Sequence, residues 1–249
     1  MLCAAQDQFE LEDRKERVMS EQPKLELIYF TGRALAESPQ MMMRYAGVEY
    51  RYEMAWDYYG KPWSETKLEV AFGQLPVLVV NDTAQIWQSG AIVRYLAKLT
   101  GTMLEDPLLA ARVDAVFEQT QELFAPLNPT VNIKIGDEHL KFKEMFLNSF
   151  PGILKNFARQ LELSDEGPYF FGSKPYYCDF SAYNHFSLAT ILQQDILNAY
   201  PSVLNFMAAV ENLSGLKEYL ASRPEIIDAG TAPKLIIDGI AKSTGTNPS

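Results

Sequence analysis

The stretch from residue 71 to residue 95, AFGQLPVLVVNDTAQIWQSGAIVRY, constrains the fold more than any other part of this chain. Residues 77–80 are four apolar, mostly β-branched side chains in succession, which favour a buried strand, and Pro76 stands only at its entrance. Asn and Asp at 81–82 then predict a turn, so residues 83–87 return as the second strand of a hairpin. We therefore expect the other elements to be arranged around this pair of strands.

A helix is predicted directly after the hairpin. Ser89 precedes apolar residues at helical spacing, namely Ile92, Val93 and Leu96. Gln88 and Ser89 thus lie at a helix N-terminus, where free backbone N–H groups and the helix dipole favour an anion such as a carboxylate.

Length and charge exclude several classes of partner. At 249 residues the chain can bury a core in one large domain or in two ordinary ones. Its 22 Lys and Arg against 32 Asp and Glu give a formal net charge of −10. This charge argues against a nucleic acid or an anionic membrane as the main partner. No apolar run approaches the roughly 20 residues that span a bilayer.

The cysteines and histidines form no recognisable reactive or metal site. Cys3 and Cys178 give neither a CxxC motif nor a disulfide framework, which suits a reducing compartment and predicts a cytoplasmic protein. His139 and His185 are isolated, so we expect them on the surface or in the core, with no metal. Phosphate-binding glycine motifs are also absent from the sequence.

The first third of the chain predicts an α/β unit. Residues 1–23 form a charged extension. Strands are expected at 25–30 and 48–54, and a helix at 34–46 lies between them and ends at Gly47. Because a helix joins the two strands, they should run parallel.

The second half predicts only helices. Glu-Asp-Pro at 105–107 marks a linker, after which helical periods run over 108–124, 139–163, 179–198, 202–212 and 216–221. The last residues, 233–249, end in a segment of Ser, Thr, Gly, Asn and Pro that we expect to be frayed.

Two motifs in the first half resemble the glutathione-binding half of cytosolic glutathione S-transferases: FGQLP at 72–76 and QSGAIVRYLA at 88–97. The resemblance implies an α/β plus all-α architecture. Its expected parts are an extension at 1–23, a thioredoxin-like glutathione-binding domain at 24–102, a linker at 103–107, an all-helical C-terminal domain at 108–232 and a tail at 233–249.

The same resemblance assigns residues to glutathione. Leu75 would offer its backbone to the cysteinyl part, with Gln74 beside it and a cis peptide bond before Pro76. Gln88 and Ser89 would hold the γ-glutamyl end.

The glycyl carboxylate of glutathione is expected at a tryptophan and a lysine upstream of Leu75. Trp63 and Lys67 have the spacing of sigma-like members, and Trp56 with Lys61 is the competing assignment. An indole N–H and an ammonium group both suit a carboxylate.

Two further residues are expected to make contacts between the subunits of a dimer. Phe72 occupies the place of the aromatic key that several classes insert into the neighbouring subunit, so a homodimer is expected. Glu118 stands where sigma-like enzymes have an Asp that reaches the glutathione amino group of the neighbour. Glutamate keeps the charge and lengthens the arm.

The start of the core helix in the C-terminal half departs from the family pattern. Cys-Asp-Phe at 178–180 resembles that start, where the family has Ser or Thr at the position of Tyr176. We therefore expect a weakened or rebuilt helix cap.

A thioredoxin-like scaffold without CxxC cannot run dithiol exchange, so the reacting sulfur must come from a ligand. A thiol with a pKa of roughly 8.5 is only about 3% thiolate at pH 7, and lowering that pKa by two units takes roughly 2.7 kcal/mol. A hydroxyl that donates a hydrogen bond to the sulfur can supply this stabilisation.

Tyr29 is the candidate donor. Tyr29-Phe30-x-x-Arg33 is similar to the catalytic-tyrosine segment of the alpha, mu, pi and sigma classes. Arg33 matches the first of two arginines found in many classes, while Leu35 stands at the second position, where mu-like members also lack arginine.

We therefore expect a glutathione S-transferase, closest to sigma-like members, that conjugates glutathione to an apolar electrophile. Glutathione is then a co-substrate, with no other cofactor. The loop after Phe30 and the helix at 108–124 would hold the electrophile. Two alternatives share the motifs: a non-enzymatic ligand carrier or crystallin-like structural member, and a glutathione-dependent isomerase such as a prostaglandin synthase.

Overall fold

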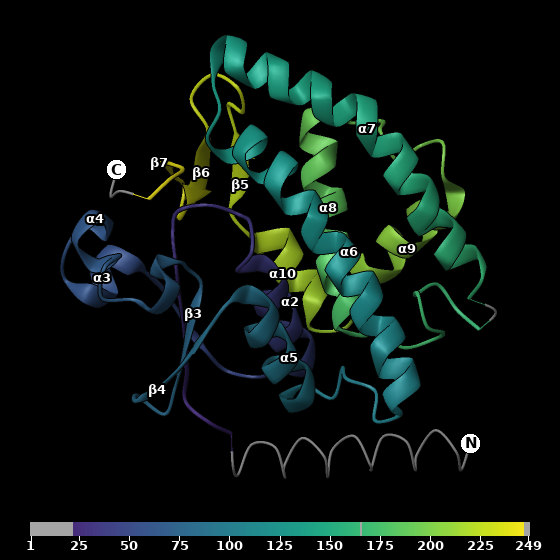
Figure 1. Cartoon of the computed structure of the whole chain (residues 1–249), viewed down its shortest axis with the longest axis horizontal. Helices are drawn as coiled ribbons and strands as arrows, with labels where there is room; N and C mark the ends of the chain where they lie inside the picture. Colours follow the sequence, from purple (N-terminus) through teal and green to yellow (C-terminus); the bar gives the residue numbers. More distant parts are fainter. Residues whose placement is uncertain (1–21, 165, 247–249) are drawn as a thin grey trace.

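The computed structural model describes residues 22–164 and 166–246, so the expected N-terminal extension falls almost wholly outside the described residues. The first domain is built on a four-stranded sheet in the order β2-β1-β3-β4 (Figure 1). Its strands are β1 (Leu25–Tyr29), β2 (Arg51–Met54), β3 (Val77–Val80) and β4 (Ala84–Trp87). β1 runs parallel to β2 and antiparallel to β3, and β3 and β4 form the predicted hairpin.

Four helices complete the first domain: α2 (Glu37–Ala46), α3 (Ala55–Tyr59), α4 (Trp63–Thr66) and α5 (Ser89–Leu99). The short α3 and α4 lie between β2 and β3. α2 buries three consecutive methionines, 41–43, and ends at Gly47, whose φ of 67° is the left-handed conformation typical of a helix stop. This order confirms the predicted thioredoxin-like arrangement.

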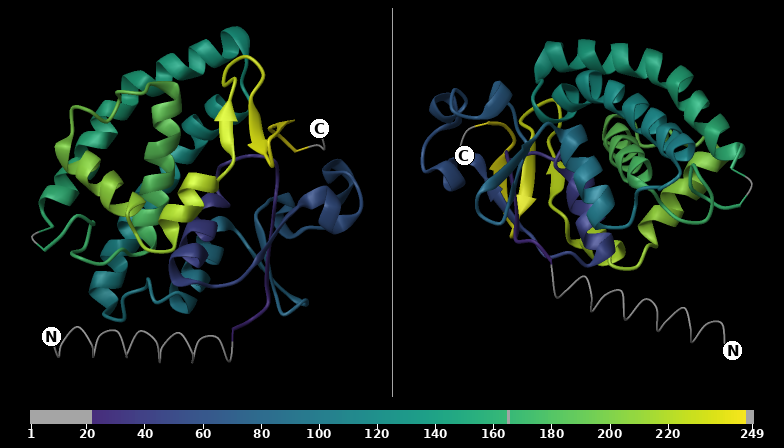
Figure 2. Two further views of the ribbon diagram at one scale, coloured as in Figure 1. Left: turned by 180° about the vertical axis from the view of Figure 1, so that it is seen from behind. Right: turned by 60° about the horizontal axis from the view of Figure 1, so that its bottom comes forward.

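The second domain is a helical bundle of α6 (Pro107–Asn132), α7 (Gly136–Glu162), α8 (Tyr177–Leu192), α9 (Pro201–Glu211) and α10 (Leu216–Ser222). α8 is buried on all sides, and Figure 2 shows it end-on within the bundle. Its Phe186 ring lies 5.3 Å from the ring of Phe157 and 6.2 Å from that of Phe206, in an aromatic cluster at the centre of the domain. None of the helices in the described part of the chain is long and apolar enough to cross a membrane.

α6 is longer than predicted. We expected this helix to end at residue 124, but it continues through Pro126 and Pro129 to Asn132. Leu127 and Val131 in this last part are fully buried, and the Thr130 hydroxyl donates to the carbonyl of Pro126 over 2.7 Å. Burial of these apolar side chains outweighs the donors that the two prolines lack.

Residues 233–246, the described part of the last segment, are ordered, which corrects the expectation that this segment is frayed. Three strands, β5 (Glu225–Ile227), β6 (Lys234–Ile237) and β7 (Ile240–Ser243), form an antiparallel sheet in that order. The turn between β6 and β7 is Asp238-Gly239, with φ of 51° and 75°. Beyond β7, the Gly245 N–H donates to the carbonyl of Thr31 over 2.8 Å, so this added sheet is fastened to the end of β1.

Two asparagines of the helical domain hold the loop that follows β1. The Asn132 amide donates to the carbonyl of Arg33 over 3.3 Å, and the Asn184 amide donates to the carbonyl of Ala34 over 3.0 Å. The loop is therefore positioned by both domains.

The cap of α8 is rebuilt around Asp179. Its buried carboxylate accepts hydrogen bonds from the backbone N–H groups of Tyr176 over 2.7 Å and Phe170 over 3.1 Å. The Asp179 N–H in turn donates to the carbonyl of Tyr176 over 3.0 Å. The backbone of Tyr176 thus takes part in the cap although this residue is neither Ser nor Thr.

Candidate functional site

Tyr29 is the last residue of β1, and its side chain is only 6% exposed. Burial raises the pKa of its hydroxyl to about 12, and a backbone hydrogen bond from Leu35 acts in the opposite direction. The hydroxyl therefore stays protonated at neutral pH and keeps a proton to donate. Leu35 stands at the position of the second arginine found in many classes. It therefore acts on the Tyr29 hydroxyl through its backbone and not through a charged side chain.

The loop before β3 has the geometry that the resemblance implied. The peptide bond between Leu75 and Pro76 is cis, and both residues are buried. In the described part of the chain, the backbone of Leu75 makes none of the hydrogen bonds found in turns and loops. Its polar groups therefore remain available to a ligand with a peptide backbone.

Gln88 and Ser89 lie at the start of α5, as predicted. Gln88 has a φ of 68° and a ψ of 123°, a conformation that costs a residue other than glycine roughly 1–3 kcal/mol. Its side-chain amide donates to Oε1 of Gln74 over 3.1 Å. The helix start and the cis-proline loop are therefore joined at the surface, and both glutamines are exposed.

Of the two assignments for the glycyl carboxylate, Lys67 has the uncommitted charge. The competing Lys61 pairs with Glu69 over 2.6 Å, whereas no carboxylate of the described residues lies within ion-pair distance of Lys67. The Lys67 side chain runs along Gly73, where an added Cβ would lie 3.3 Å from its Cγ. Trp63 is 8% exposed and packs edge-on against Phe30 with ring centres 5.1 Å apart.

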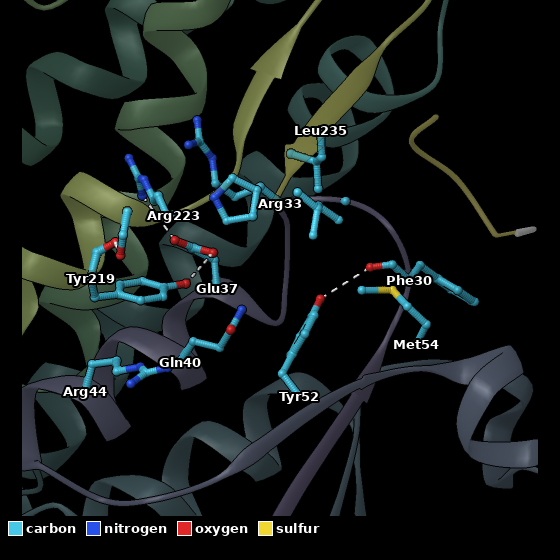
Figure 3. Close-up of a pocket in the computed structure, with 14 residues that line it drawn as sticks. Phe30, Arg33, Glu37, Gln40, Arg44, Tyr52, Met54, Tyr219, Arg223 and Leu235 are labelled. Carbon is cyan, nitrogen blue, oxygen red and sulfur yellow. Dashed lines mark hydrogen bonds and ion pairs between the residues drawn. The ribbon is translucent and has the colours of Figure 1, made fainter. Parts of the chain in front are cut away.

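Arg33 faces a different space from the residues assigned to glutathione. It lines a cavity of about 260 Å³ between α2, β2, α10 and β6 (Figure 3). This cavity includes Phe30 and Arg33 from the loop after β1, and no residue of α6 lines it. One wall comes from the added C-terminal strand β6, whose hairpin signal, Asp238-Gly239, was present in the sequence. The role of the helix at 108–124 in holding the electrophile stays a prediction.

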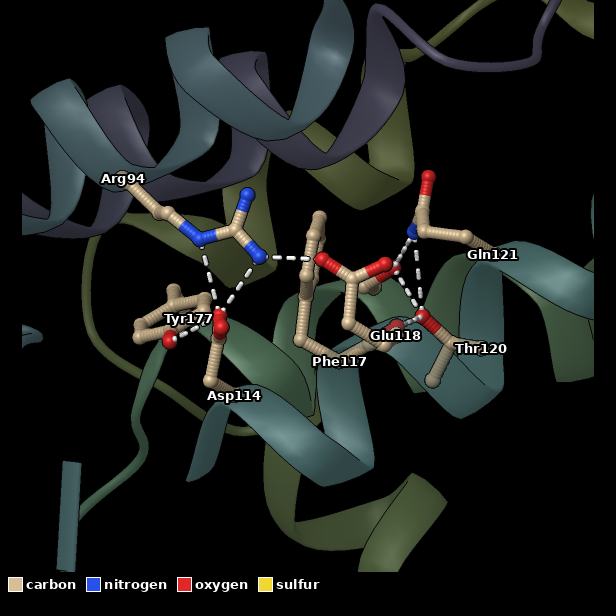
Figure 4. Close-up of polar contacts among 8 residues, drawn as sticks. Arg94, Asp114, Phe117, Glu118, Thr120, Gln121 and Tyr177 are labelled. Atoms are coloured by element: carbon tan, nitrogen blue, oxygen red, sulfur yellow. Dashed lines mark hydrogen bonds and ion pairs between the residues drawn. The ribbon is translucent and has the colours of Figure 1, made fainter. Parts of the chain in front are cut away.

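Glu118 is engaged within its own chain. Its carboxylate contacts the guanidinium of Arg94 on α5, which also donates through Nε to Asp114 over 2.8 Å (Figure 4). The hydroxyl of Tyr177 donates to the same oxygen of Asp114 over 2.7 Å, and Arg94 lies 5.1 Å from the ring centre of Phe117. To contact a glutathione amino group in another subunit, as predicted, the Glu118 carboxylate would have to give up this ion pair with Arg94.

The remaining polar candidates have structural partners. His139 and His185 are buried, and their Nδ1 atoms lie 2.9 and 2.8 Å from backbone carbonyls of Thr130 and Ser181. Burial raises the pKa of the Cys178 thiol well above its usual range. In the described ranges, no group of three or more potential metal ligands lies close together.

Comparisons with known proteins agree on one family. Family models described as "Glutathione S-transferase, N-terminal domain" and "Glutathione S-transferase, C-terminal domain" match residues 25–98 and 128–223. A Caenorhabditis elegans protein, "Probable glutathione S-transferase 6", is 30% identical over 207 residues, covering 80% of this chain and 96% of the relative.

Two other proteins are informative about function and assembly. "Hematopoietic prostaglandin D synthase" of Gallus gallus is 29% identical over 208 residues, covering 82% of this chain and 98% of that protein. A solved structure described as monomeric Na-GST-3, a glutathione S-transferase of Necator americanus, matches with a TM-score of 0.71 and 26% identity, covering 82% of this chain and 100% of that one.

Proposed function

The chain belongs to the glutathione S-transferase family, and from this premise we propose that it forms the glutathione thiolate beside Tyr29 and adds it to an apolar electrophile. It is a transferase, and glutathione is its co-substrate. The observation that carries the proposal is the buried, protonated hydroxyl of Tyr29 at the end of β1, next to the backbone of Leu35.

Tyr29 acts in this proposal as a hydrogen-bond donor and not as a base. With a pKa of about 12, only about one hydroxyl in 10⁵ is ionised at pH 7. Its O–H bond can instead point at the sulfur and stabilise the thiolate, while the thiol proton leaves to solvent. The backbone of Leu35 lies at the same hydroxyl and helps to fix its position.

The two ends of glutathione would meet complementary groups. The γ-glutamyl carboxylate binds at Gln88 and Ser89, where the N-terminus of α5 offers N–H groups and a positive dipole end. The glycyl carboxylate binds at Lys67 and Trp63. The free charge of Lys67 and its position along Gly73, next to Gln74 and the cis-proline loop, support this assignment.

We also propose a homodimer that works in the cytoplasm. The Phe72 side chain is 73% exposed with a φ of 61°, so it does not pack in its own domain and is free to enter a neighbouring subunit. In such a dimer, Glu118 would exchange Arg94 for the amino group of the glutathione bound to the partner. The absence of a disulfide framework supports the cytoplasmic assignment.

An isomerase is the second candidate, because the chain is similar along most of its length to a prostaglandin D synthase. Both activities use the same thiolate, but conjugation consumes glutathione and isomerisation returns it. Turnover with a generic chloronitroarene, run beside a glutathione-affinity pull-down, tests the proposal. Consumption of glutathione one-for-one with product supports the transferase. Conversion of an endoperoxide without loss of glutathione favours the isomerase, and binding without any turnover favours a ligand carrier.

A further inference from the structure

The cavity beside Arg33 is separate from the groups assigned to glutathione. Its walls come from the loop after β1, the outer side of α2, the end of β2, α10 and β6. Tyr29, Lys67, Gln88 and the cis-proline loop are not among its lining residues. Phe30 lies between the two regions, since it lines the cavity and also packs against Trp63.

One side of this cavity carries an excess of positive charge. Arg33, Arg44 and Arg223 line it together with a single carboxylate, Glu37. Both oxygens of Glu37 are already engaged, one by Arg223 over 3.1 Å and the other by the hydroxyl of Tyr219 over 3.1 Å. No carboxylate therefore remains for the other two arginines.

The partners of these two arginines are not anionic. Arg44 donates to the hydroxyl of Tyr50 over 3.3 Å and lies over the rings of Tyr50 and Tyr219. Arg33 has no ion pair with any described residue, and its buried Nε has no hydrogen-bond partner. The pKa of Arg33 is lowered to about 10, mainly by burial and in part by the charge of Arg223, against the opposing effect of Glu37. An anion in the cavity would relieve both the burial and the repulsion.

The opposite side of the cavity is apolar. Figure 3 shows Arg223 and Glu37 on one side, Phe30 and Met54 on the other, and Leu235 above them. Ile237 from the same strand as Leu235 completes this wall. The volume of about 260 Å³ lies just below the roughly 300–1,000 Å³ of typical small-molecule pockets. A ligand that fits must therefore be small and must be anionic at one end and apolar along its body.

We propose that this cavity binds a small amphipathic carboxylic acid, with its carboxylate at Arg33 and its apolar chain against Phe30, Met54 and Leu235. A guanidinium offers a planar fork of donors that matches the two oxygens of a carboxylate. The site is separate from the glutathione site, because none of the groups assigned to glutathione lines the cavity.

Calorimetric titration of the full chain with octanoate tests this site. Affinity should rise roughly fourfold for each methylene between butanoate and octanoate, as expected for a buried chain. Octanol and the octylammonium ion, which match the length without the negative charge, should bind at least tenfold more weakly. Equal binding of octanoate and octanol would overturn the assignment of the arginines, and no variant is needed for that comparison.

Two further measurements locate the acid. Arg33→Gln should weaken octanoate binding at least tenfold, while Arg112→Gln, which changes an exposed arginine on α6, should leave it unchanged. Saturating glutathione should also leave octanoate binding unchanged. Competition by glutathione would mean that the acid binds at the tripeptide's own carboxylate sites, and an unaltered affinity in Arg33→Gln would remove the cavity from consideration.

Discussion

The side-chain amide of Gln88 donates a hydrogen bond to Oε1 of Gln74 over 3.1 Å. Gln74 precedes the cis bond between Leu75 and Pro76, and Gln88 precedes α5, so this contact joins the two sequence motifs that resemble glutathione-binding segments. Because Gln88 is also held at a positive φ, its orientation is set by the fold before a ligand arrives.

Gln88→Ala combined with Ser89→Ala should weaken glutathione binding about ten- to a hundredfold, because hydrogen bonds to a charged group contribute roughly 1.5–3 kcal/mol. The fold should be retained, since the Gln88 side chain is exposed and Ser89 is only half-buried. Calorimetry measures the affinity, and Gln160→Ala, at an exposed position on α7, is the control. Unchanged affinity in the double variant would show that the γ-glutamyl end binds elsewhere.

Phe72→Ser should weaken the proposed dimer about thirtyfold or more, because a buried aromatic anchor contributes about 2 kcal/mol. Sedimentation velocity over a concentration series measures the effect. Leu140→Ser, which removes another exposed apolar side chain on α7, should leave the assembly unchanged. If the wild-type chain sediments as a monomer at micromolar concentration, both the dimer and the role of Glu118 across it are wrong.

His185 should make the protein less stable in mild acid. Burial lowers its pKa to about 4, below the ordinary 6.5, so between these values the unfolded chain takes up a proton that the folded chain does not. The free energy of unfolding should therefore fall by about 3 kcal/mol as the pH drops from 6.5 to 4. Urea unfolding across this range should show that His185→Gln loses this part of the pH dependence. The same slope in both proteins would contradict the assignment.

The N-terminal domain and the backbone geometry around its candidate site could be predicted from the sequence because their signals are local. The strand at 77–80, its turn and the helix start at Gln88 lie within 25 consecutive residues. The cis bond before Pro76 came from the family resemblance, and the structure has it.

The contacts that position the loop after β1 could not be predicted, because they join distant parts of the chain. Asn184 reaches Ala34 and Asn132 reaches Arg33 across the domain interface, and neither asparagine belongs to a motif. The C-terminal sheet differs, because Asp238-Gly239 is a known hairpin signal that the polar composition of the segment obscured. The buried ion pair between Glu37 and Arg223 could not be predicted either, because it forms only when the fold brings α2 next to α10.

Tyr29→Phe is the most direct test of the proposed chemistry. The variant loses one oxygen and should keep its fold, although the backbone of Leu35 loses a partner, at a cost of about 1 kcal/mol. Glutathione should still bind, while loss of roughly 1–3 kcal/mol of thiolate stabilisation lowers the rate at pH 7 about ten- to a hundredfold. The rate should recover in part as the pH rises toward the pKa of the free thiol. Ultraviolet titration of the bound thiolate measures that pKa directly. Tyr59→Phe is the matched control, because it removes a buried hydroxyl that has no hydrogen-bond partner. An unshifted titration with full turnover in Tyr29→Phe would remove Tyr29 from the mechanism and direct attention to the hydroxyl of Thr31.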